Sequence, residues 1–125
     1  MYTSAERAYD DGRKTSLSSR ELEAAALFKA ARVLEVCRLE WEVPGSGSRL
    51  EEALRQNLRL WTFFQGELSR QDHEIPVDLR RNLLQLSAFV DRRTFELLAH
   101  PQREKLQVLI EINRQVASGL AVTPA

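Results

Sequence analysis

The sequence has few of the residues from which small catalytic and metal sites are built. It holds one cysteine and two histidines, so an intramolecular disulfide and a cysteine-rich metal site are excluded. It contains no glycine-rich phosphate loop, no His-Glu-x-x-His sequence and no paired cysteine motif. Neither His73 nor His100 has a candidate nucleophile or second metal ligand at a motif spacing. We therefore expect a protein that is not an enzyme and that uses no metal or cofactor.

An excess of charge of one sign is also missing. Eighteen basic residues balance eighteen acidic residues. Without a basic tail or stripe the chain has no general phosphate-binding surface, so nucleic acid is not an expected partner. No apolar run approaches the roughly 18 residues that a membrane span requires, and the first residues lack the apolar stretch of a signal peptide. We expect a cytoplasmic protein that does not enter the membrane.

What the sequence does have is helical periodicity. Apolar residues recur at spacings of three and four along most of the chain, and no segment shows the alternation typical of a strand. The pattern predicts an all-α fold in a single domain over residues 1–125, a compact bundle of four long helices preceded by a short one. The predicted helices cover residues 4–11, 19–42, 49–69, 76–99 and 102–118.

Residues that begin or end helices flank these segments. They are the capping boxes Ser18 with Glu21 and Ser48 with Glu51, the loop at 44–48, Pro76 in a first turn, and Gly119 as a C-cap. The second predicted helix carries many alanines on a broad apolar surface, whose seam includes Val33 and which Val36 widens further. This composition predicts a central helix that its neighbours approach closely.

Polar residues interrupt three of the apolar seams. Asn57 and Asn113 occupy positions that the spacing assigns to the interior. Arg93 does the same on the fourth helix, where the predicted seam is Leu79, Leu83, Leu86, Val90 and Leu97. We assign Asn82 to the same buried polar network as the other two asparagines.

Two explanations for these polar residues stay open. A buried unsatisfied amide costs about 1–3 kcal/mol, and an unpaired buried charge costs more. The groups either bond one another or helix-end carbonyls and fix the register of the helices, or they line a groove that a partner segment fills.

Aromatic residues indicate where such a groove would lie. Trp61 and Phe64 are on the third predicted helix, and Arg92, Arg93 and Phe95 are on the fourth. Aromatic rings beside guanidinium groups are typical of interface hot spots. We predict that these five residues bind a partner. Packing in the core is the competing explanation for each aromatic side chain.

Sequence blocks in order along nearly the whole chain carry a resemblance. They are Met1-Tyr2, Ala8-Tyr9, Lys14-Thr15, Arg20-Glu21-Leu22-Glu23-Ala24-Ala25, Glu52-Ala53-Leu54, Asn57-x-Arg59-Leu60-Trp61-Thr62-x-Phe64-Gln65, most of 79–96, and shorter matches at 105–106, 112–114 and 119–120. Together they resemble the FlaF family of flagellar biosynthesis regulators. The loop at 44–48 is the least similar to the family.

The resemblance implies a small cytoplasmic protein of flagellated bacteria, mostly alphaproteobacteria, that is needed for flagellin production and filament assembly. It implies two protein partners. One is flagellin, bound in the manner of a secretion chaperone or an assembly checkpoint, and the other is the companion regulator FlbT, which acts on flagellin messenger RNA. The family has no agreed catalytic residues to carry over.

Two alternatives compete with protein binding. Arg80, Arg81, Arg92 and Arg93 would form a local basic patch that binds flagellin messenger RNA directly, in spite of the balanced total charge. The domain would otherwise assemble with copies of itself. The sequence does not decide the oligomeric state.

Overall fold

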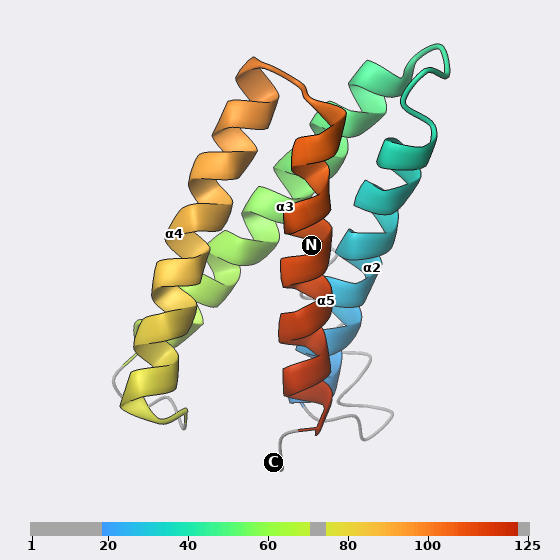
Figure 1. Ribbon diagram of the computed structural model, residues 1–125. Coiled ribbons are helices and arrows are strands. Elements are labelled where there is room, and N and C mark those ends of the chain that lie inside the picture. Colours follow the sequence, from blue (N-terminus) through green and yellow to red (C-terminus); the bar gives the residue numbers. More distant parts are fainter. Residues whose placement is uncertain (1–18, 71–74, 123–125) are drawn as a thin grey trace, which may run out of the picture.

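The computed structural model describes residues 19–70 and 75–122, which are almost entirely helical (Figure 1). Its elements are α2 (Ser19–Leu39), α3 (Ser46–Leu68), α4 (Val77–Ala99), the 3-10 helix η1 (Arg103–Lys105) and α5 (Leu106–Val122). No strand occurs in these two ranges, so the predicted all-α class is confirmed for them. The short helix predicted at 4–11 and the cap residue Ser18 lie outside the described residues.

The four α-helices differ in how closely they pack. The antiparallel helices α2 and α5 lie side by side along their length, and α3 crosses behind them toward α4 (Figure 1). α4 contacts chiefly α3 and touches α5 at few points. The bundle is therefore tight between α2 and α5 and looser along α4.

The close approach of α2 and α5 follows from small side chains. Ala24 and Ala31 of α2 and Ala117 of α5 are buried, and alanine lets helix backbones come near to each other. This agrees with the central position predicted for the second helix. The buried stripe is narrower than predicted, because Val33 and Val36 are 36% and 49% exposed.

α3 begins earlier than its sequence predicted. Its first residue is Ser46, and Gly45 precedes it with φ of 83°, a left-handed conformation that glycine adopts without strain. The predicted capping box of Ser48 and Glu51 is wrong, because Ser48 already lies inside the helix. The Ser46 hydroxyl instead donates a hydrogen bond of 2.9 Å to the Trp41 carbonyl oxygen. The predicted loop at 44–48 thus ends at Gly45.

Other helix ends also differ. α2 ends at Leu39 rather than at 42, and Pro76 is the N-cap of α4 rather than its first helical residue. η1 stands where the start of the last helix was predicted. α5 continues to Val122, so Gly119 is not a C-cap. A glycine costs a helix only about 1 kcal/mol relative to alanine, which is not enough to end one that packs along its length.

Candidate functional site

Three buried polar side chains join α3 to α5. Trp61 Nε1 donates to Asn113 Oδ1 at 2.9 Å, and Asn113 Nδ2 donates to Asn57 Oδ1 at 2.7 Å. All three residues are 1% exposed or less. The two asparagines bond each other, as the first of the two explanations predicted, and this pairing fixes the register of α3 against α5. Asn57 Nδ2 has no hydrogen-bond partner within the described ranges.

Asn82 is not part of this network. It is exposed on α4, so the prediction of a buried Asn82 is wrong. The predicted seam of α4 is confirmed at Val90 and Leu97, which are buried, and is wrong at Leu79, which is 47% exposed. Ser87 and Thr94, which the seam did not include, are also buried. The Thr94 hydroxyl donates to the Val90 carbonyl oxygen at 2.6 Å, which lets a polar residue occupy the interior side of the helix.

Arg93 is half-buried and is held by contacts within the chain. Its Nη1 donates to the Lys105 carbonyl oxygen at 3.3 Å, and its Nε lies 3.5 Å from Glu96 Oε2. The guanidinium carbon lies 5.2 Å from the centre of the Phe89 ring, a cation–π distance. These contacts tie α4 to the end of η1. They correspond to the explanation in which a polar seam residue bonds a helix-end carbonyl.

The structure does not bring the five predicted partner-binding residues into one groove. Trp61 and Phe64 are 1% and 6% exposed and belong to the core cluster. Arg92 is exposed on α4, and Phe95 is 57% exposed there. The predicted role of the five residues in partner binding stays a prediction, and it now concerns two separate surfaces.

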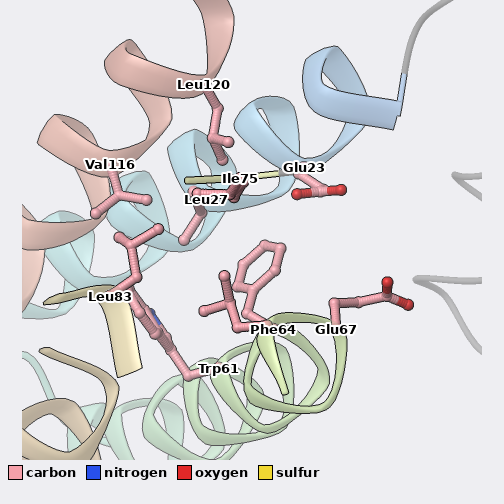
Figure 2. A pocket seen from close by; sticks show the side chains of 10 residues that line it. Glu23, Leu27, Trp61, Phe64, Glu67, Ile75, Leu83, Val116 and Leu120 are labelled. Atoms are coloured by element: carbon pink, nitrogen blue, oxygen red, sulfur yellow. The ribbon is translucent and has the colours of Figure 1, made fainter. Parts of the chain in front are cut away.

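An open pocket with a largely apolar lining lies where α2 begins and α5 ends, and its cavity volume is about 30 Å³. Its lining comes from all four α-helices and from Ile75, two residues before α4 begins. The lining residues are Glu23, Leu27, Trp61, Phe64, Glu67, Leu68, Ile75, Leu83, Val116 and Leu120. Figure 2 shows the Phe64 ring rising from α3 toward Leu27, and the Trp61 ring extending from the same helix toward Leu83. The sequence pointed to the two aromatic residues but not to the pocket that they help to form.

Two carboxylates also line this pocket. Glu23 comes from α2 and Glu67 from α3. Burial, followed by the negative charge of Glu67, raises the pKa of Glu23 from 4.5 to about 7, against a smaller lowering by Arg20. Glu67 itself forms an ion pair of 3.3 Å with Arg70. The spacing could have indicated that Glu23 lies near the interior. It is four residues, or one helical turn, before Leu27, which is buried.

Residues 5–120 match the family model described as Flagellar protein FlaF. The chain belongs to the FlaF family. No curated protein and no solved structure matches it. FlaF membership makes this a flagellar protein, and the assignment of roles to particular residues depends on the geometry above.

The arginines proposed as an RNA-binding patch in this FlaF protein are mostly engaged within the chain. Arg80 Nη1 donates to the Arg70 carbonyl oxygen at 2.9 Å, and Arg81 forms an ion pair of 2.6 Å with Asp78. Arg93 has the contacts described above. These partners reduce the positive charge available to a phosphate backbone, so the structure gives RNA binding no added support.

Two further properties of the described part of this FlaF protein bear on its function. None of its helices is both long enough and apolar enough to cross a lipid bilayer. Residues 19–70 and 75–122 also hold no group of three or more histidine, cysteine or acidic residues placed to bind a metal ion. The pocket and the exposed surface of α4 around Phe95 are the two candidate sites.

Proposed function

We propose that this FlaF-family protein acts in the cytoplasm, where it promotes flagellin production and filament assembly by binding flagellin, the companion regulator FlbT, or both in succession. Toward flagellin it acts as a secretion chaperone or an assembly checkpoint. The observation that carries the proposal is the open pocket at Trp61 and Phe64, because it offers an apolar cavity to a side chain from another protein.

The pocket is suited to one side chain of an amphipathic helix. Helices that bind in grooves insert apolar anchors spaced three or four residues apart. Burial of one leucine or phenylalanine anchor contributes about 1.5–3 kcal/mol. The cavity of about 30 Å³ opens to solvent and has room for about two water molecules, so the lining side chains must move apart to admit such an anchor. Coverage of the apolar stripe of flagellin would keep the subunit soluble until export.

The exposed surface of α4 supplies a second contact in this proposal. Phe95 is 57% exposed, and Arg92 lies three residues before it on the same helix. A large exposed ring beside a guanidinium group matches the composition of interface hot spots. The same surface is available to FlbT while the pocket holds flagellin, which would let the two partners bind in succession or together.

Calorimetric titration of the purified protein with flagellin, with the isolated terminal helices of flagellin and with FlbT tests the proposal. We expect micromolar or tighter binding of at least one of them. Leu120→Trp, which fills the pocket, should weaken the binding of flagellin, and Phe95→Ala should weaken the binding of at least one partner. Leu39→Ala is the control, because Leu39 is a 60% exposed apolar residue at the end of α2, outside the pocket lining.

The proposal fails under a specific combination of results. One is the absence of binding to flagellin and to FlbT at micromolar concentrations. The other is normal filament assembly in cells that carry Leu120→Trp, Arg92→Ala or Phe95→Ala at wild-type protein levels.

A further inference from the structure

The pocket has a negative side. Figure 2 shows the carboxylates of Glu23 and Glu67 on the same side of the pocket, beyond the Phe64 ring. The remaining lining residues are apolar or aromatic, and none of the ten is basic. Within the described residues Glu67 pairs with Arg70, whose side chain is 59% exposed, and such exposed pairs contribute little stabilisation.

We propose that the pocket binds an amphipathic helix with a lysine or arginine one turn away from the apolar anchor, and that this cation lies between Glu23 and Glu67. The inference rests on the proposed function and names the chemistry of the helix that the pocket selects. One helical turn rises about 5.4 Å, so residues three or four apart project side by side. An anchor beside Phe64 thus brings its basic neighbour to the two carboxylates.

Electrostatics selects the basic helix over the alternatives. A purely apolar helix would cover Glu23 and Glu67 without giving them a partner, and desolvation of an unpaired carboxylate costs several kcal/mol. An acidic helix would add repulsion between like charges. A lysine or arginine instead is attracted by the negative charge of both carboxylates and donates charge-assisted hydrogen bonds to them.

The same geometry makes binding depend on pH. Glu23 must lose its proton to receive the cation, and its pKa in the free protein is about 7. The charged groups near it are Arg20 on its own helix and Glu67 on α3, with Arg70 beside Glu67. α4 and α5 contribute Leu83, Val116 and Leu120 to the lining, none of which titrates. Affinity for a basic helix should therefore rise about tenfold between pH 6 and pH 8.

Synthetic helical peptides test the inference with the full-length protein. Three peptides of about 15 residues, long enough to form a helix, would share one leucine-based apolar stripe and carry a single lysine, glutamine or glutamate one turn before the central leucine. We expect the lysine peptide to bind at least about tenfold more tightly than the glutamate peptide at pH 8. The preference should disappear in the double variant Glu23→Gln/Glu67→Gln.

Two variants localise the binding. Leu120→Trp fills the pocket and should abolish binding of the lysine peptide, whereas Ser118→Trp, at an exposed position two residues earlier on α5, should leave it unchanged. Circular dichroism and thermal unfolding verify that both variants fold. Equal affinity for the three peptides, or a lysine preference that survives in Glu23→Gln/Glu67→Gln, overturns the inference. So does a failure of all three peptides to bind.

Other occupants of the pocket are also distinguishable. Displacement of the lysine peptide by a synthetic peptide of residues 1–18 would assign the pocket to this chain itself and overturn the inference. Concentration-dependent dimers in sedimentation, lost in Leu120→Trp and retained in Ser118→Trp, would assign the pocket to a second copy. Either result replaces the basic partner helix with a different occupant.

Failure of this inference is separable from failure of the proposed function. If flagellin binds the wild-type protein and Glu23→Gln/Glu67→Gln equally well at pH 6 and pH 8, flagellin is a partner but the acidic side of the pocket does not select it. If the lysine peptide binds as described and neither flagellin nor FlbT does, the pocket recognises a basic helix of a different protein.

Discussion

Replacement of Glu23 by glutamine tests the environment of the pocket in the free protein. The pKa of Glu23 is raised from 4.5 to about 7 in the folded chain, so the folded state holds this proton more tightly than the unfolded state does. The resulting stabilisation is fully present below pH 4.5 and is lost as the pH rises through about 7. Glutamine keeps the shape and polarity of the protonated acid and does not titrate.

The size of the effect follows from the shift. Each pKa unit corresponds to about 1.4 kcal/mol, so the shift sets an upper limit of roughly 3 kcal/mol. Glu23 is only half-buried, and solvent screening lowers the expected value to about 1–2 kcal/mol. Glu23→Gln should therefore be more stable than the wild-type protein by about 1–2 kcal/mol at pH 8, and the difference should be small at pH 4.5.

Urea denaturation at half-unit intervals from pH 4.5 to pH 8.5 measures this difference. Glu42→Gln is the control, because Glu42 is exposed in the connection between α2 and α3. Removal of the neighbouring charge by Glu67→Gln should move the Glu23 transition to lower pH, since the charge of Glu67 raises the Glu23 pKa. A wild-type pH profile that is parallel to that of Glu23→Gln would refute the reasoning.

Four further substitutions test the fold. Asn113→Ala should lower the free energy of unfolding by about 3 kcal/mol, because it leaves two buried hydrogen-bonding groups without a partner; chemical denaturation measures the loss, and a change below about 1 kcal/mol contradicts it. Gly45→Ala should destabilise the protein by about 1–2 kcal/mol at φ of 83°, whereas Gly66→Ala, in the helix with no atom within 4 Å of the added carbon, should stabilise it by about 0.5–1 kcal/mol; equal melting temperatures would show the backbone argument to be wrong. Arg93→Ala should cost about 1 kcal/mol through loss of the bond to the Lys105 carbonyl oxygen, and faster hydrogen exchange confined to the junction of α4 and η1 would locate that loss.

Spacing alone predicted the interior face of α3. The seam residues Leu50, Leu54, Asn57, Trp61, Phe64 and Leu68 are all buried. The prediction succeeds because these six residues recur at spacings of three and four, and residues at such spacings lie on one face of a helix. The same spacing identified the two asparagines as interior residues, and their mutual bond required only that α3 and α5 be neighbours.

On α4 the spacing was only partly right, because two hydroxyl residues are buried there and one of them, Ser87, has no hydrogen-bond partner within the described residues. Ser87 and Thr94 occupy the interior side, where we expected only apolar residues. The Thr94 hydroxyl donates a hydrogen bond to the Val90 carbonyl oxygen of its own helix, so burial of this hydroxyl costs little free energy. Arg93, next to the buried Thr94, is half-buried at the edge of the interface. The spacing had instead predicted that Arg93 lies on the interior seam.

The pocket could not be predicted from the sequence. Its lining combines residues from all four helices, among them Glu23, Leu83 and Val116, and no periodic pattern states which helices are neighbours. The start of α3 was missed for a local reason. Gly45 ends the connection by backbone conformation alone, with no side-chain cap, whereas the prediction depended on cap side chains.

The uneven packing of the bundle reconciles a stable fold with an accessible site. The side chains of α2 and α5 interlock around small residues, and the buried bond between Asn57 and Asn113 adds a fixed register between α3 and α5. The side-chain bond that joins α4 to α3, from Gln65 Nε2 to Asp91 Oδ2 at 2.8 Å, is only partly buried, and two of the four buried residues of α4 carry hydroxyl groups. Because α4 contributes Leu83 to the pocket, the least tightly held α-helix is also one wall of the cavity. A small displacement of this wall would widen the cavity without breaking the α2–α3–α5 core, so an entering anchor need not unfold any part of it.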